Sequence, residues 1–125
     1  MAQTIQLVAD FTPDVKAATD LRSFQYFVVQ YGSNGVNIAN DLVGTSGHFW
    51  ILGNAPNSGQ PCQLVGGPNI FKVVVNTTAT RDRLLSAAAS GFAGPGDVSS
   101  PALWLGWALT ATNVGCGELV TVKVL

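Results

Sequence analysis

Short apolar runs broken at close intervals by glycine and proline turns constrain the fold of this chain more than any other sequence feature. The stretch ILGNAPNSGQPCQLV, residues 51–65, has two apolar runs held apart by polar residues, glycines and prolines. Such runs recur about every eight to twelve residues, without a repeat of fixed period. The pattern predicts about seven to nine short antiparallel strands and an all-β fold, a single small β-sandwich or barrel.

Turn chemistry sets the boundaries of these strands. Asn34-Gly35 favours a tight hairpin, because both central positions of such a turn take positive φ. Gly106, inside the run LWLGWALTA, indicates a bulge or a close backbone approach. In the final run ELVTVKVL, Val120, Val122 and Val124 are expected on one face, and Leu119, Thr121 and Lys123 on the other. The expected strands cover residues 24–31, 36–39, 48–52, 62–66, 70–76, 83–88, 103–111 and 118–125, with a helical turn near 83–88.

Two segments do not follow the strand pattern. Residues 91–101, GFAGPGDVSSP, are expected to form a loop because Gly-Pro-Gly interrupts regular structure, and Phe92 is then exposed. In residues 1–23, QTIQLV alternates like a strand, whereas ADFTPDVKAATDLRS is polar and carries much of the charge. This segment is either an extended N-terminal arm or a first strand plus a long loop. Residues 24–125 are expected to form the β-domain.

The composition limits the partners of the chain. Charged residues make up 10% of the 125 residues, against about 25% in an average domain. Either partners cover much of this weakly charged surface, or the chain is a neutral secreted domain. The net charge is −1 and the cations are scattered, which argues against direct nucleic-acid binding. No run approaches the ~20 apolar residues of a membrane span.

The expected compartment determines the expected state of the two cysteines. The N-terminus lacks the basic and apolar regions of a signal peptide, so we expect synthesis in a cytoplasm. Cys62 and Cys116 are then expected as free thiols. A bridge between them requires that the strands carrying them lie side by side.

The sequence offers little for catalysis or metal binding. His48 is the single histidine, and no local signature supplies the nucleophile and orienting group that a catalytic histidine needs. One histidine and two separated cysteines cannot form a zinc site, and Asp10, Asp14 and Asp20 lack the spacing of a calcium loop. We therefore expect no enzyme activity, no metal and no cofactor.

The tryptophans suggest one alternative function. Trp50, Trp104 and Trp107 could present a sugar-stacking face, although at least two of them are expected in the core. Trp104 and Trp107 are three residues apart, so they point to opposite faces of a regular strand, unless a bulge at Gly106 changes this. The alternative is a carbohydrate-binding β-sandwich that uses Trp104 or Trp107.

Five short motifs follow one another in the last two thirds of the chain: ILGNAPNSGQ (51–60), KV (72–73), DRL (82–84), GWAL (106–109) and GELVTV (117–122). Their order resembles that of the small tailed-phage capsid decoration, or cement, proteins. Arg81 stands where such sequences have a turn glycine, and Gln60 where an acid is common; residues 1–47 are not matched.

The resemblance implies a structural virion protein without enzymatic activity. Its partner would be the major capsid protein, whose neighbouring subunits it clamps from the outer surface of the head, after synthesis in the host cytoplasm. It would be a homo-oligomer, with a trimer more plausible than a dimer. The N-terminal arm and one sheet edge are expected to contact the capsid. The candidate contact residues are chosen from the sequence itself and not from the resemblance: Ile5, Leu7 and Phe11 are apolar residues in a segment with little core of its own, and Phe92 is an apolar residue on an expected loop.

Overall fold

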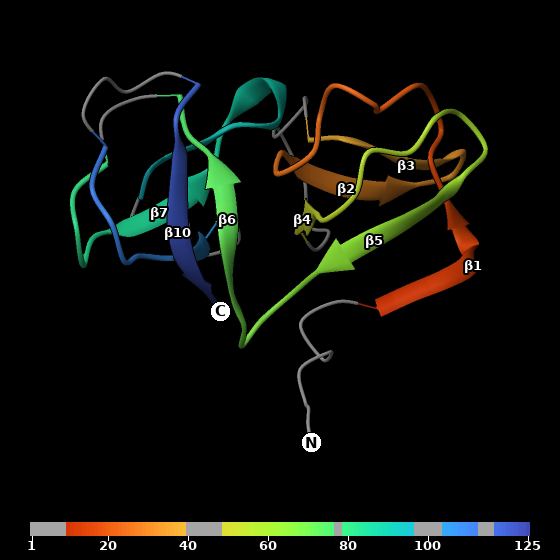
Figure 1. Ribbon diagram of the computed structural model, residues 1–125. Coiled ribbons are helices and arrows are strands. Elements are labelled where there is room, and N and C mark those ends of the chain that lie inside the picture. The colour runs from red at the N-terminus through yellow and green to blue at the C-terminus, as the bar shows by residue number, and fades with distance from the viewer. Residues whose placement is uncertain (1–9, 40–48, 77–78, 97–103, 113–116) are drawn as a thin grey trace.

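In the computed structural model, the described residues are 10–39, 49–76, 79–96, 104–112 and 117–125, and they form ten short strands in two antiparallel sheets. The predicted all-β, sandwich-like fold is confirmed (Figure 1). In spatial order, the first sheet comprises β1 (Asp10–Lys16), β5 (Pro61–Val65), β4 (Trp50–Leu52), β2 (Val28–Gly32) and β3 (Gly35–Ile38). The second comprises β6 (Ile70–Val74), β10 (Leu119–Val124), β9 (Trp104–Ala108), β7 (Leu84–Ala87) and β8 (Ala93–Pro95).

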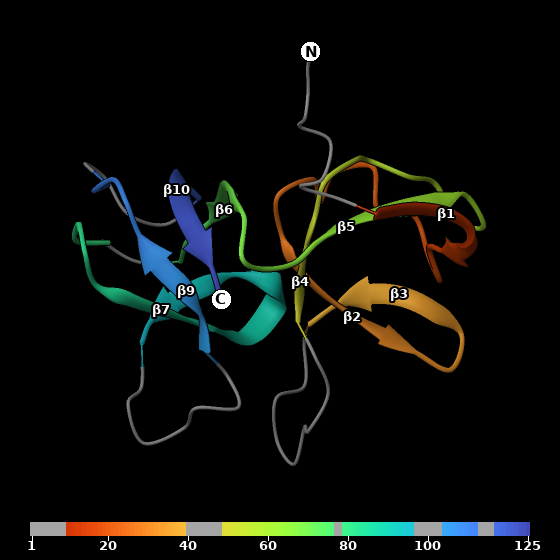
Figure 2. The same ribbon diagram turned by 90° about the horizontal axis from the view of Figure 1, so that it is seen from below.

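Each sheet curls until its two edges meet. A parallel bridge joins Ala17 to Val36 in the first sheet, and another joins Val75 to Ala93 in the second. The Ala18 amide donates to the Val36 carbonyl at 2.8 Å, and the Asn76 amide donates to the Ala93 carbonyl at 2.9 Å. The curled sheets lie side by side in both views (Figures 1 and 2). Closure occupies part of each edge, which reduces the strand edge available for pairing with another chain.

The two sheets share one hydrophobic core. Val28, Ile51 and Val65 of the first sheet join the inward side chains of the second, among them Val73 and Val122. Strand alternation places Val29, Leu52 and Cys62 on the opposite face of the first sheet, where they form a second cluster with Ala17 and Leu21. The first sheet therefore buries residues on both faces.

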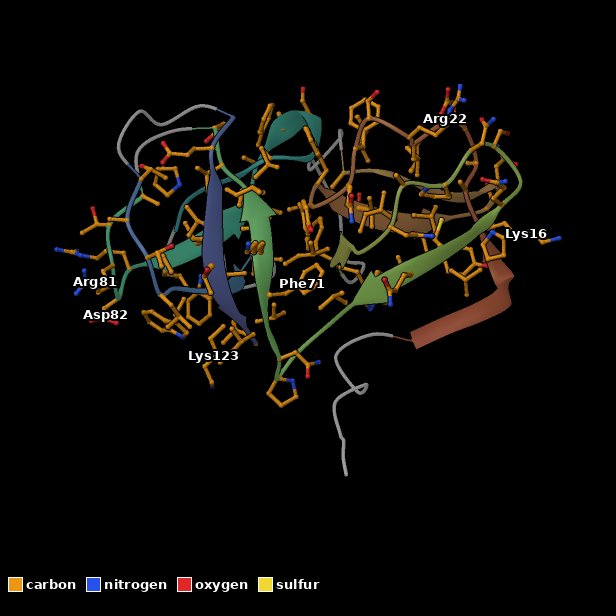
Figure 3. All side chains as sticks on the ribbon, viewed as in Figure 1. Lys16, Arg22, Phe71, Arg81, Asp82 and Lys123 are labelled. Atoms are coloured by element: carbon orange, nitrogen blue, oxygen red, sulfur yellow. The ribbon has the colours of Figure 1, made fainter. Side chains whose placement is uncertain are left out.

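Tyr26 connects the sheets through its backbone. Its amide donates to the Leu52 carbonyl of β4 at 2.8 Å, and its carbonyl accepts from the Val74 amide of β6 at 3.0 Å. The rings of Tyr26 and Phe71 are in contact, with centroids 5.6 Å apart, and Phe71 lies between the sheets in Figure 3. Tyr26 has a positive φ of 73°, which is incompatible with a regular strand at this residue. The prediction of a strand from residue 24 is therefore wrong, and β2 begins at Val28.

The turn between β2 and β3 begins one residue earlier than the prediction from Asn34-Gly35. Gly32 pairs with Gly35, so Ser33 and Asn34 form the two-residue loop. Gly35 has a φ of 119°, and a Cβ there would lie 2.5 Å from the Lys16 carbonyl oxygen. Glycine is required at this position by both the backbone conformation and the close approach of the chain after β1.

The expected loop at 91–101 contains a strand. Ala93–Pro95 form β8, which pairs with β7 through Leu85 and Pro95. Proline is tolerated because β8 is the last strand of its sheet, where a missing amide donor breaks no inner ladder. A 3-10 turn at Ala89–Gly91 precedes it, near the helical turn expected beside the strand at 83–88.

The start of the described chain belongs to the first sheet. β1 pairs with β5, and its register shifts between Phe11 and Lys16. Beyond it, Ala17 and Leu21 are buried. Residues 10–21 therefore belong to the first sheet and its core, whereas residues 1–9 lie outside the described residues.

Candidate interaction face

The outward surface of the second sheet is the candidate functional site. Val120, Val122 and Val124 point into the core, as predicted, and Leu119 and Lys123 are exposed. Strand register then sets a row across four strands: Leu84 opposes Trp107, Trp107 opposes Lys123, and Lys123 opposes Ile70. We call this surface the open face. It is defined by Ile70, Lys72, Leu84, Trp104, Trp107, Leu119, Thr121, Lys123 and Leu125.

A bulge in β9 brings two tryptophans to this face. Leu85 pairs with Gly106 and Ser86 with Trp104, which leaves Leu105 as the extra residue. Leu105 is buried, whereas Trp104 is half-buried and Trp107 is 43% exposed. The irregularity expected at Gly106 is therefore present. A bulge aims both indoles outward, although they are three residues apart.

Gly106 also fulfils the expectation of a close backbone approach. A Cβ at this position would lie 2.2 Å from the Lys123 carbonyl oxygen and 3.0 Å from the Val124 Cα. Strand β10 can therefore lie against β9 only because residue 106 has no side chain.

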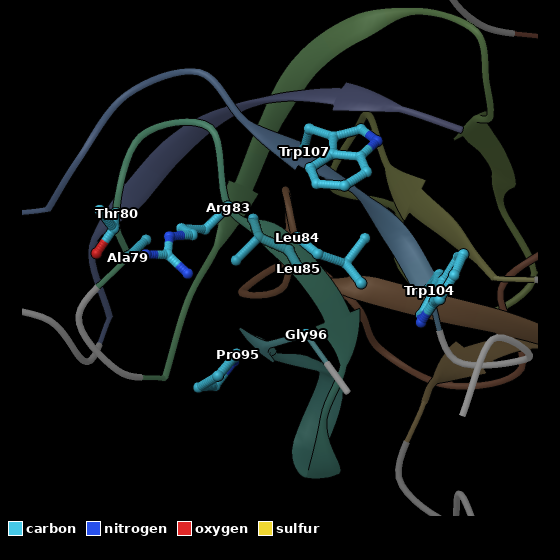
Figure 4. Close-up of a pocket in the computed structure, with 9 residues that line it drawn as sticks. All are labelled: Ala79, Thr80, Arg83, Leu84, Leu85, Pro95, Gly96, Trp104 and Trp107. Atoms are coloured by element: carbon cyan, nitrogen blue, oxygen red, sulfur yellow. The ribbon is translucent and has the colours of Figure 1, made fainter. Parts of the chain in front are cut away.

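A groove of about 430 Å³ runs beside the two indoles (Figure 4). Trp104 and Trp107 of β9 line it together with Leu84 of β7. Arg83 and Thr80 add a guanidinium and a hydroxyl group. The remaining lining residues are Ala79, Leu85, Pro95 and Gly96.

Exposed apolar side chains concentrate on the open face. Ile70 is 59% exposed, Leu125 53% and Leu119 42%, in addition to Trp107. Among the described residues, Tyr31 is the one other large apolar side chain with comparable exposure. The open face also carries Lys72 and Lys123 and has no acidic side chain at its defining positions. Lys123 lies beneath β10 in Figure 3.

Outside this face, Cys62 and Asp20 have shifted pKa values, each with a local cause. Cys62 is a buried free thiol, and burial raises its pKa to about 11. The side chain of Arg22 donates to the exposed carboxylate of Asp20 at 2.8 Å, which lowers the pKa of Asp20 to about 2. In the part of the chain that the structure describes, no three histidine, cysteine or acidic side chains gather as metal ligands. No helix in that part could cross a membrane.

The residues that the sequence analysis singled out, as capsid contacts or for other chemistry, lie in different parts of the chain. Ile5, Leu7, His48 and Cys116 lie outside the described residues. Phe11, in β1, pairs with Gln63 of β5. The expectation that Phe92 is exposed is wrong, because it is half-buried and its ring lies 5.2 Å from that of Phe27. Trp50 packs against the second hydrophobic cluster.

Sequence reasoning did not select Ile70, Lys72, Leu119 or Leu125 as contact residues. The alternation in ELVTVKVL already placed Leu119 and Lys123 on one face. Joining Ile70 to them requires the pairing of β6 with β10, which local sequence does not encode.

The fold was compared with known proteins. No family model matches the chain, and no curated protein sequence matches it. A solved structure with a similar fold is the head fiber gp8.5 N base in bacteriophage phi29, with a TM-score of 0.62 and 17% sequence identity. The alignment covers 94% of this chain and 93% of that one. The two chains share this fold over nearly their whole lengths.

Proposed function

We propose that this chain is a structural protein of a tailed-phage virion, bound to the outside of the head as a decoration or cement protein. The observation that carries the proposal is the shared fold, which spans 94% of this chain and belongs to the base of a phage head fiber. The motif order in residues 51–122 supports the same proposal independently, because it resembles that of capsid decoration proteins.

The physical properties of the chain suit this role. Closed sheets around a common core give a stiff body, and the role needs no enzyme activity, cofactor, nucleic-acid contact or membrane contact. The major capsid protein is the proposed partner. A body that contacts two capsid subunits at once is retained strongly even when each contact is weak, because the second contact forms at high effective concentration.

Several finer features belong to the same proposal. The protein is a homo-oligomer, with a trimer favoured over a dimer, and it clamps neighbouring capsid subunits after synthesis in the host cytoplasm. Ile5, Leu7 and Phe11 are proposed as N-terminal contacts. Light scattering during gel filtration gives the oligomeric mass, and protein analysis of purified virions tests the location.

Co-sedimentation tests the main proposal. Purified protein is mixed with heads that lack it, before and after shell expansion, and bound copies are quantified on gels. Saturation at a fixed ratio to the major capsid protein, with preference for expanded heads, is expected. Absence of binding to both forms refutes the proposal. An N-terminal truncation must stop at residue 9, because β1 begins at Asp10 and a longer deletion would disrupt the first sheet.

A carbohydrate-binding function is the second candidate. The β9 bulge places Trp104 and Trp107 beside one groove with Arg83 and Thr80, and pockets of roughly 300–1,000 Å³ with aromatic walls and a few polar groups are common ligand sites. Tryptophan fluorescence titrated with a glycan panel tests it. A saturable shift specific to one sugar would favour this function, and an unchanged spectrum across the panel would count against it.

A further inference from the structure

We infer that, in addition to the N-terminal contacts proposed above, the open face binds the phage head, and that its partner there is an acidic protein surface with an apolar centre. This inference rests on the proposed function and specifies its contact. Three observations support it: the position of the exposed apolar side chains, the sign of the charges among them, and the covering of the other sheet.

The apolar side chains form a centre and flanks. Trp107 lies in the middle of the row Leu84, Trp107, Lys123 and Ile70. Leu119 and Leu125 stand at either end of β10. Monomeric proteins rarely expose contiguous apolar patches unless the patch is a contact site. A tryptophan at the centre of such a patch is the kind of residue that carries most of an interface's binding energy.

The first sheet offers no comparable surface at residues 15–39 and 49–65, whose side chains the structure describes. Its clusters bury Val28, Ile51 and Val65 on one face and Val29 and Leu52 on the other. Tyr31, 51% exposed, is its single large apolar side chain with such exposure.

The charges indicate the chemistry of the partner. Lys72 and Lys123 stand among the apolar side chains of the open face, which has no acidic side chain at its defining positions. Carboxylates on the partner would complement them and steer the approach of the two proteins. A second copy that docked through the same face would oppose like charges, which disfavours this chain as its own partner there.

The aliphatic residues favour a protein over a saccharide. The groove beside Trp104 and Trp107 could accept a sugar ring, but Ile70 and Leu119 lie on β6 and β10 and do not line it. A protein surface can cover the whole open face, whereas a saccharide in the groove would leave these two side chains in water.

Variants matched for chemistry test the inference by co-sedimentation with heads that lack the protein. Trp107→Ala removes the central indole, and Lys72→Glu with Lys123→Glu reverses the charges. Tyr31→Ala and Lys16→Glu are the controls, because they alter an exposed aromatic residue and an exposed lysine of the first sheet. Circular dichroism and melting temperature establish that each variant is folded, and Leu119→Ser supplies a second apolar variant.

The expected result is a specific loss. Trp107→Ala should raise the dissociation constant about thirty-fold or more, which corresponds to the threshold of about 2 kcal/mol for an interface hot spot. The charge reversal should weaken binding several-fold and reverse its dependence on salt between about 50 and 500 mM, because salt then screens a repulsion between like charges instead of an attraction. The controls should bind as the wild type does.

Each contrary outcome identifies a different error. Failure of the wild-type protein to bind refutes both the proposed function and this inference. Wild-type binding with unchanged binding of the three open-face variants refutes the inference alone. Loss of sugar binding in Trp107→Ala with full head binding would assign the face to a saccharide. A change in oligomeric mass with Trp107→Ala would assign it to a second copy, and both results overturn the inference.

Discussion

Replacement of Gly106 by alanine should destabilise the protein strongly, because this glycine determines how closely two central strands pack. The added Cβ would lie 2.2 Å from the Lys123 carbonyl oxygen, 2.9 Å from its carbonyl carbon and 3.0 Å from the Val124 Cα. All three are backbone atoms of β10, so no side chain can rotate to make room. Strand β10 must move away from β9.

The cost follows from two effects. Overpacking in a well-packed region costs about 1–3 kcal/mol, and weakening one inter-strand hydrogen bond costs about another 1 kcal/mol. The free energy of unfolding should therefore fall by roughly 2–4 kcal/mol. For a domain of this length, each kcal/mol lowers the melting temperature by about 3–5 °C, which gives a decrease of roughly 6–20 °C.

Thermal unfolding followed by circular dichroism measures this decrease. Gly32→Ala is the matched control: the nearest atom to its added Cβ is the Gly35 carbonyl oxygen at 3.7 Å, an ordinary contact. Its stability should change by less than about 0.5 kcal/mol. If Gly106→Ala melts within about 2 °C of the wild type with an unchanged near-ultraviolet tryptophan spectrum, the close approach of β9 and β10 is wrong.

Three further predictions concern the core and the titratable groups. Ile51→Ala removes a fully buried side chain from the shared core, so unfolding should remain a single transition in urea but lose about 2–5 kcal/mol. Because burial raises the pKa of Cys62 to about 11, the native thiol should react slowly with a disulfide reagent. The stability that the neutral, buried thiol confers should be fully present below about pH 8.5, the pKa of a cysteine in the unfolded chain, and should decline as pH rises through the folded pKa of about 11. Denaturation experiments from pH 8 to 11, with Cys62→Ala as the control, measure this loss of stability. NMR titration should give Asp20 a pKa of about 2, and Arg22→Gln should raise it, so the small stabilisation by this pair is lost as pH falls below about 4.

Local sequence patterns predicted most of the strands. The run IFKVVVN contains β6, Ile70–Val74, and the run ELVTVKVL contains β10, Leu119–Val124. In β10 the alternation also separated the buried valines from Leu119 and Lys123. These features could be predicted because a strand's side chains alternate between faces with a period of two, whatever the strand pairs with.

The candidate site could be predicted only in part. Gly106 signalled an irregular strand, but whether Trp104 and Trp107 share a face depended on the position of the extra residue, Leu105, relative to β7. Phe92 was misplaced because its burial comes from Phe27, more than sixty residues earlier in the chain. Contacts of this kind arise from chain closure over long distances, which local composition does not report.

The strand class, the turns and the inward and outward faces of single strands can be read from local sequence, because these follow from backbone sterics and side-chain alternation. The tertiary structure alone decided which strands became neighbours, and it closed each sheet with a bridge, at Ala17 with Val36 and at Val75 with Ala93. It also covered both faces of the first sheet and left one face of the second open. The physical reason is that pairing and burial depend on segments far apart in the chain, whose mutual fit appears only after folding.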